Sequence, residues 1–250
     1  MKVITKNKKR NLSRSEVIKI RIIHYLKLIH DLYNHIRELG LRNLTIVIIG
    51  KLNNRLFDLK HGLDTKPHLD MATAIKKGLK YEDRFHGSKY SDTSLLALRD
   101  LFSALDINSD SILLDVGCGK GLVLLTALEF GFKEIRGFDH SQFLCDIAIN
   151  NCLKYQKKLG TNTTVKINGV SAIDYQFQDD ENILYLYNPF DDYISEKFLE
   201  IVESSLNRNK RKMLIITHRW PGIDLLKERF KPTTENRYTF WGKSFNVFQI

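Results

Sequence analysis

Three glycines and two acids form the pattern in this sequence that most clearly could do chemistry. The glycines are Gly117, Gly119 and Gly121, in a stretch that begins at Asp115 and reads Asp-Val-Gly-Cys-Gly-Lys-Gly. Glycine lets the backbone turn with positive φ and pass close to a bound ligand. Asp139 ends the next apolar run, where a carboxylate can accept hydrogen bonds from both hydroxyls of a ribose. The pattern therefore predicts a site for a nucleotide-type ligand.

The spacing of the glycines distinguishes between two kinds of ligand. A dinucleotide fingerprint reads G-x-G-x-x-G and places a pyrophosphate at the start of a helix. Here the spacing is G-x-G-x-G, and Asp115 lies two residues before the first glycine. A carboxylate at this position would repel a pyrophosphate and would favour a ligand that carries an ammonium group. An oxidoreductase that uses NAD is therefore the weaker alternative.

The glycine turn and the two acids resemble motif I and the second-strand acid of the class I S-adenosylmethionine (SAM) methyltransferases. The resemblance implies that SAM is the cofactor and that Gly117, Gly119 and Gly121 pass under its methionine part. It also implies that Asp115 faces the ammonium group of SAM and that Asp139 holds the ribose. The other positions implied to contact SAM are Cys118, His140, Ser171, Ala172, Asn188 and Tyr90.

Two of these positions concern the adenine and the closing of the site. Ser171 stands where the family commonly has an acid that meets the adenine amino group, and Asp174 is the alternative. Class I enzymes often close over SAM with the segment before the first core helix, where Tyr90 is the expected lid residue. His61 and His86 each precede a glycine, and for both a turn residue is a commoner role than an acceptor-side base.

The acceptor side of the site is predicted from the segment Tyr187-Asn188-Pro189-Phe190. It follows the expected fourth strand, at the position of motif IV, which faces the transferred methyl group in the family. Amino-methylating members often read Asn/Asp-Pro-Pro-Tyr/Phe there, so this chain is one proline short. We expect Asn188, Phe190 and Tyr187 to line the acceptor pocket, although an ordinary Asn-Pro turn at the end of a strand would read the same way.

A segment before the glycine turn narrows the resemblance. Residues 57–65 read Phe-Asp-Leu-Lys-His-Gly-Leu-Asp-Thr. Together with Gly-Cys-Gly-Lys-Gly and Tyr-Asn-Pro-Phe, this segment is similar to a group of uncharacterised bacterial SAM methyltransferases. Methyl transfer itself needs in-line placement of the acceptor, exclusion of water and, for some acceptors, removal of a proton. We therefore expect neither a catalytic triad nor a metal.

Alternating strands and helices must position these residues, and the alternation predicts a parallel sheet with helices on both faces. The resemblance implies a Rossmann-like sheet of seven strands that ends in an antiparallel hairpin. A helix is expected to begin at Ser91 or Asp92 and to end near Leu105. The other expected elements are strands over 112–116, 134–139, 164–168, 183–187, 213–217, 237–241 and 244–250, and helices over 120–130, 141–159, 194–206 and 223–230.

Three parts are expected along the chain: a disordered basic tail over 1–12, a helical and irregular extension over 13–90, and the SAM-binding domain over 91–250. Apolar residues recur at helical spacing over 13–39, which predicts a long amphipathic helix.

The rest of the extension is less regular. Residues 44–49 are rich in β-branched side chains and fit either a strand or a second short helix. Residues 53–92 are polar and are expected to be irregular.

The net charge of +10 is concentrated at the start of the chain. Residues 1–60 hold 14 Lys and Arg against 4 Asp and Glu, whereas residues 61–250 hold 25 of each. A basic segment of this kind is typical of contact with nucleic acid, an anionic membrane surface or an acidic partner. A solvated face on an ordinary docking helix explains the charge equally well.

The cysteines and the apolar runs set the expected location. The three cysteines, Cys118, Cys145 and Cys152, form no C-x-x-C, and their odd number argues against a disulfide framework. No apolar run approaches the roughly 18 residues of a membrane span, and no signal peptide is visible in residues 1–15. These features predict a reduced, cytoplasmic protein without a transmembrane segment.

The acceptor is the part of the function that the sequence leaves open. A small molecule or glycan-type metabolite is the leading expectation. A protein side chain and RNA are alternatives, and RNA is favoured only by the basic residues 1–60. A SAM-binding protein that has lost catalysis and serves as a regulatory or interaction partner is a further alternative, against which the intact glycine turn and Asn188 argue.

Overall fold

The computed structural model describes residue 43 and the ranges 45–66 and 93–250. Two compact units divide the chain between Ile48 and Ile49. The elements that build the site all belong to the second unit.

Several expectations fall outside the described residues. The basic tail over 1–12, the helix over 13–39, the lid residue Tyr90 and the loop residue His86 are among them. Within the part of the chain that the structure describes, no helix has the length and apolar composition needed to cross a membrane.

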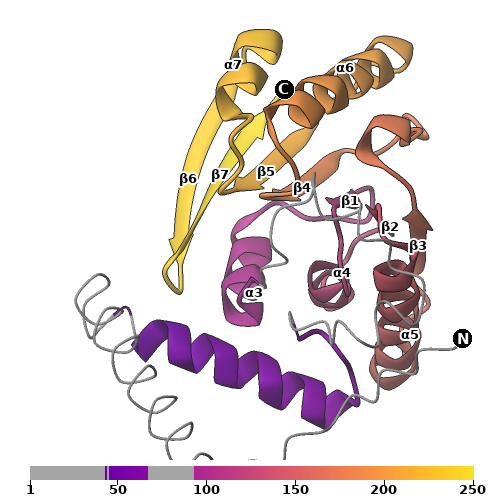
Figure 1. Ribbon diagram of the computed structural model, residues 1–250, viewed down its shortest axis with the longest axis vertical. Coiled ribbons are helices and arrows are strands. Elements are labelled where there is room, and N and C mark those ends of the chain that lie inside the picture. The colour runs from indigo at the N-terminus through magenta and orange to yellow at the C-terminus, as the bar shows by residue number, and fades with distance from the viewer. Residues whose placement is uncertain (1–42, 44, 67–92) are drawn as a thin grey trace, which may run out of the picture. The chain divides into compact units, whose positions relative to one another are not determined.

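One sheet of seven strands forms the centre of the second unit. The strands are β1 (Ile112–Val116), β2 (Glu134–Asp139), β3 (Thr164–Gly169), β4 (Ile183–Tyr187), β5 (Leu214–His218), β6 (Thr234–Phe240) and β7 (Lys243–Gln249). Their order is β3-β2-β1-β4-β5-β7-β6 (Figure 1). The first five strands are parallel, whereas β7 runs antiparallel to both β5 and β6. This arrangement confirms the expected Rossmann-like sheet with its C-terminal antiparallel hairpin.

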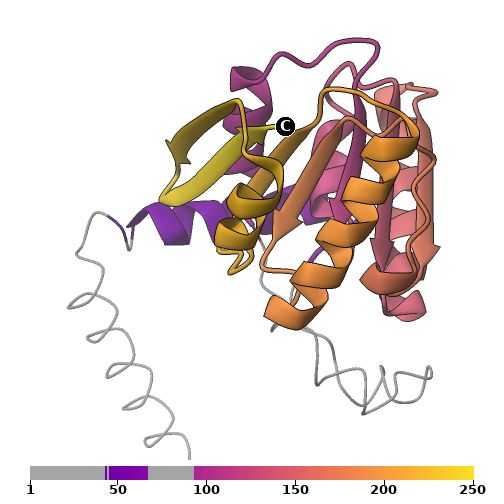
Figure 2. The same ribbon diagram turned by 90° about the horizontal axis from the view of Figure 1, so that it is seen from above.

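Helices cover both faces of the sheet. They are α3 (Leu95–Ala104), α4 (Leu122–Ala127), α5 (Gln142–Leu159), α6 (Asp192–Arg208) and α7 (Ile223–Phe230), with a short 3₁₀ helix, η2 (Ala172–Asp174). Residues of α3, α4 and α5 pack in one apolar cluster with one face of the sheet. Residues of α6 and α7 pack in a second cluster with the other face (Figure 2). Since both faces are covered, every residue of β1 is buried.

A further helix precedes this core and ends at His61 (indigo in Figure 1). Irregular structure was expected from residue 53 onward, and over 53–61 that expectation is wrong. The segment 44–49, which fitted either a strand or a helix, is helical over the described residues 45–49.

Contacts with distant residues explain why this segment is helical. Phe57 and Asp58 are buried. The Asn54 side chain donates to the carbonyl oxygen of Thr93 and accepts from the N–H of Leu95, each at 2.9 Å. Asn54 therefore satisfies the free N–H at the start of α3, where Ser94 supplies no side-chain cap. A tertiary contact of this kind leaves no local signal in the sequence.

Candidate functional site

The glycine turn lies where the strand order reverses, at the carboxyl ends of β1 and β4. This is the edge at which open α/β sheets bind their ligands. Gly117, Gly119 and Gly121 have φ values of 77°, 52° and 85°. Residues with a Cβ rarely adopt this left-handed region, so the turn depends on glycine.

The turn is closely packed by two other parts of the site. A Cβ added to Gly117 would lie 3.3 Å from the Cβ of Pro189, and one added to Gly121 would lie 3.1 Å from the Cβ of Ala148. Cys118, between the first two glycines, is buried. The glycine turn is therefore wedged between α5 and the Asn-Pro turn after β4, and the two motifs predicted from sequence are in contact.

Asp115 is the penultimate residue of β1, next to the turn, and only 3% of the residue is exposed. Its Oδ2 atom has no hydrogen-bond partner among the described residues. Burial raises the pKa of the Asp115 carboxyl, and the charge of Asp139 raises it further. A buried carboxylate oxygen without a donor is well suited to a cationic group, so this position fits the ammonium group of SAM.

Asp139 joins the end of β2 to the glycine turn. Its Oδ2 accepts the N–H of Gly119 at 3.0 Å, and its Oδ1 accepts the N–H of Ser141 at 2.9 Å. Nδ1 of His140 lies 3.3 Å from the same Oδ1. Burial raises the pKa of Asp139, while His140 and the two N–H bonds oppose the increase. Beyond its bond to Gly119, Oδ2 keeps a second lone pair that a ribose hydroxyl can use.

The segment after β3 is held beside Asp139. The N–H of Val170 donates to the carbonyl oxygen of Asp139 at 2.9 Å. Ser171 and Ala172 follow directly, and Ala172 begins η2 with 8% of its surface exposed. Both residues therefore lie at the same edge as the predicted ribose position, whereas Asp174 is exposed. Their roles toward the adenine stay predictions.

The predicted acceptor side lies at the ends of β4 and β5. Asn188 has a φ of 41°, and its N–H donates to the carbonyl oxygen of His218 at 3.0 Å. The ring of Tyr187 lies 4.6 Å from the ring of His218, and Nζ of Lys243 lies 5.9 Å from the Tyr187 ring. Strands β4 and β5 thus contribute a pair of aromatic rings, and β7 contributes a cation beside it.

Phe190 is placed differently from the other two predicted acceptor residues. Its residue surface is 6% exposed, and its ring centroid lies 5.5 Å from that of Phe198 and 6.5 Å from that of Trp220. The ring therefore packs in the apolar cluster under α6 and anchors the turn. Its contact with an acceptor stays a prediction.

His218 is the residue of this site that the sequence analysis missed. Its Nδ1 lies 2.6 Å from the carbonyl oxygen of Ser244, so Nδ1 is the protonated nitrogen. Nε2 is buried without a hydrogen-bond partner among the described residues. Burial lowers the pKa of His218 to about 4, although the bond to Ser244 acts in the opposite direction. The imidazole is therefore neutral at physiological pH and keeps a lone pair on Nε2.

Residues 71–194 match the family model described as histone methylation protein DOT1. The match spans slightly less than half of the chain and includes both the glycine turn and the Asn-Pro turn. It agrees with the strand order and with the fit of Asp115 and Asp139 to SAM. The chain is a SAM-dependent methyltransferase. No curated protein matches it.

Solved structures similar to this methyltransferase have low sequence identity to it. An RNA methyltransferase from Salinibacter ruber, in complex with S-adenosyl-L-homocysteine, is 15% identical, with 64% of this chain and 94% of that chain covered and a TM-score of 0.48. A possible methylase from Clostridium difficile is 13% identical, with 64% and 52% covered and a TM-score of 0.47. The fold assignment rests on the strand order and not on these similarities.

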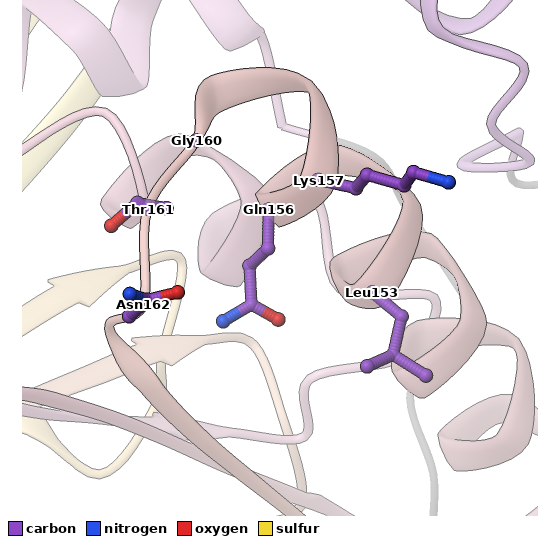
Figure 3. A pocket seen from close by; sticks show the side chains of 6 residues that line it. All are labelled: Leu153, Gln156, Lys157, Gly160, Thr161 and Asn162. Atoms are coloured by element: carbon purple, nitrogen blue, oxygen red, sulfur yellow. The ribbon is translucent and has the colours of Figure 1, made fainter.

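Two other features of the methyltransferase lie away from the glycine turn. A depression at the end of α5 is lined by Leu153, Gln156, Lys157, Gly160, Thr161 and Asn162 (Figure 3). Because α5 starts beside Asp139 and its 18 residues extend for about 27 Å, the depression lies at the other end of the sheet. His61 packs its ring against Phe57 and Tyr155, at centroid distances of 4.9 Å each. This packing supports a structural role for His61.

Proposed function

We propose that this methyltransferase acts on a small-molecule or glycan-type metabolite that carries an anionic group. The observation that carries the proposal is the pair of cations at the predicted acceptor side. Lys243 lies beside the Tyr187 ring, and Arg219 follows β5 as an exposed residue next to His218. Both charges act on the His218 ring electrostatically. Cations next to an aromatic surface favour an acceptor with a flat polar body and a negative group.

The side chains at the acceptor side have chemistry suited to an amine or a hydroxyl. Bound SAM would supply a methyl group activated by its sulfonium: the acceptor's lone pair would bond to the methyl carbon as the carbon–sulfur bond breaks, and the acceptor would release a proton to water. In this proposal the side-chain oxygen of Asn188 accepts a hydrogen bond from the acceptor molecule. This bond orients the lone pair of the acceptor toward the methyl group. Nε2 of the neutral His218 keeps a lone pair that can accept a hydrogen bond from the acceptor.

The other acceptor classes are supported less well by the same surface. A Lys-rich protein tail would bring like charges close to Lys243 and Arg219, which opposes binding. The carboxylates of Asp191 and Asp192 follow the Asn-Pro turn, but that of Asp191 already accepts the N–H of Ile194 at 3.0 Å. RNA is the second candidate, because it is anionic and because residues 1–60 carry the whole charge excess.

Transfer of a labelled methyl group tests the proposal directly. The full chain is incubated with methyl-labelled SAM and, separately, with acidic oligosaccharides and sugar phosphates, with total RNA, and with basic protein. We expect label in the first set and a loss of labelling in Lys243→Gln at unchanged affinity for S-adenosylhomocysteine (SAH). Labelling of RNA or protein alone would overturn the choice of acceptor, and binding of SAM without any transfer would favour the regulatory alternative.

A further inference from the structure

The segment that contains Asp64, outside the methyltransferase core, contacts the glycine turn directly. Oδ1 of Asp64 lies 2.9 Å from Nζ of Lys120, the residue between the second and third glycines. The Lys120 side chain is 3% exposed, whereas that of Asp64 is 55% exposed. The ion pair therefore joins a buried cation inside the SAM turn to a carboxylate at the surface.

Asn151 of α5 reinforces the same junction. Its Oδ1 accepts the N–H of Asp64 at 3.0 Å, and its Nδ2 donates to the carbonyl oxygens of Asp64 and Lys120 at 2.9 Å and 3.0 Å. Asn151 is 1% exposed, and its bond to the carbonyl oxygen of Lys120 is buried. A single side-chain amide thus holds the backbone of the segment and the backbone of the glycine turn together.

The segment is also fixed at its own base. The carboxylate of Asp58 accepts the N–H of Thr65 at 3.1 Å and its hydroxyl at 2.8 Å, and both residues are buried. The ammonium of Lys154 donates to the carbonyl oxygen of Gly62 at 3.1 Å. Asp64 is therefore presented by a rigid loop and is not a mobile surface acid.

We infer that Asp64 is a positioning residue for SAM binding, acting through Lys120 and Asn151 on the conformation of the glycine turn. Each glycine of the turn has a left-handed φ, and an unliganded turn of this kind has many alternative conformations. Asp64 fixes the ammonium of Lys120, and Asn151, which also holds the backbone of Asp64, fixes the carbonyl of Lys120. The turn is then held in the conformation that binds SAM, so less conformational entropy is lost on binding.

Calorimetric titration of SAH against variants of the full chain tests this role without any acceptor. We expect Asp64→Asn to raise the Kd for SAH by roughly tenfold, the size of one charge-assisted hydrogen bond. Asp64→Glu should recover most of the affinity. In Asp64→Asn combined with Lys120→Gln, the loss should be smaller than the product of the two single losses, because both act on one interaction.

The matched control is Glu235→Gln, which removes one carboxylate from the surface ion pair with Lys227, where the two atoms are 2.8 Å apart. It should leave the Kd for SAH unchanged. All titrations are made well below the melting temperature of each variant, which is measured separately. An Asp64→Asn protein that is folded and binds SAH like the parent overturns the inference, even if it melts earlier. Because only SAH is used, failure of the acceptor proposal cannot produce this result.

Discussion

The SAM side of the site is made largely of backbone, whereas the acceptor side is made of side chains from three strands. At the SAM side, glycine is needed at positions 117 and 121 because a Cβ there would lie too close to Pro189 or Ala148. At the acceptor side, Tyr187 lies against His218, two residues that are far apart in sequence. A binding turn made of backbone requires glycines at a fixed spacing, which the sequence shows, whereas a surface assembled from separate strands has no such spacing. This difference explains why the sequence predicts the cofactor but not the acceptor.

The largest effect is expected from a substitution in the glycine turn. Gly121→Val places a branched side chain at a φ of 85° and against Ala148, so we expect the Kd for SAH to rise by about 100-fold or more. Gly160→Val is the matched control, because Gly160 also has a left-handed φ of 67° but meets no atom within 4 Å. Calorimetry should show normal SAH binding in the control. Equal losses in both variants would mean that the close packing of the turn is not required.

Asp139→Ala removes the side-chain acceptor that we expect to hold the ribose of SAM. A lost hydrogen bond to a charged group costs on the order of 1.5–3 kcal/mol, so the Kd for SAH should rise roughly tenfold to 100-fold. Since Asp139 also holds Gly119, circular dichroism and a thermal melt accompany the titration. An unchanged affinity in folded protein would show that the ribose is held elsewhere.

Asn188→Ala should affect the other side of the comparison. We expect turnover to fall by roughly tenfold while the Kd for SAH stays near that of the parent, because we propose that the Asn188 side chain binds the acceptor. Initial rates with the labelled acceptor and calorimetry with SAH separate the two quantities. Parallel losses of rate and SAH affinity would assign Asn188 to the cofactor side, and no loss at all would leave it an ordinary turn residue.

The smallest expected effect concerns pH. The pKa of Asp115 is raised by burial, and only its ionised form attracts the ammonium group of SAH. The carboxyl gains its proton as the pH falls through this raised pKa, so the Kd for SAH should increase several-fold on the acid side. At pH values above this raised pKa, Asp115→Asn should bind SAH more weakly than the parent, and it should lose the pH dependence, as SAH titrations over a series of pH values would show. A parallel pH dependence in parent and variant would exclude Asp115 as its source.

The sequence predicted the parts of the fold whose cause is local. The expected bounds of β1, β2 and β4 are those of the structure, and β4 is a continuous apolar run. Periodicity did not reveal the helix that ends at His61, because its buried face is defined by contacts such as that of Asn54 with Leu95. His218 was missed for the same reason, since nothing near it in sequence distinguishes a buried ring whose partner is the carbonyl of Ser244.

The site prediction was limited in a similar way. Asp64 and Lys120 were each part of a motif that the sequence analysis quoted, yet spacing alone could not show that they pair. Phe190 was expected to line the acceptor pocket by resemblance. The structure packs its ring on Phe198, because an aromatic ring next to a buried strand gains free energy from apolar burial. Its contact with an acceptor stays a prediction.

The junction between Asp64 and the glycine turn also bears on the order in which the protein assembles. Asp64 is synthesised before both of its partners, which follow it by 56 residues at Lys120 and by 87 at Asn151. Closing such long loops costs chain entropy that only later packing offsets. The segment must therefore wait, during synthesis on the ribosome, until α5 has emerged and folded against β2. The segment around Asp64, which is synthesised early, is thus among the last parts of the second unit to reach its final position. The glycine turn is fixed only when this segment docks.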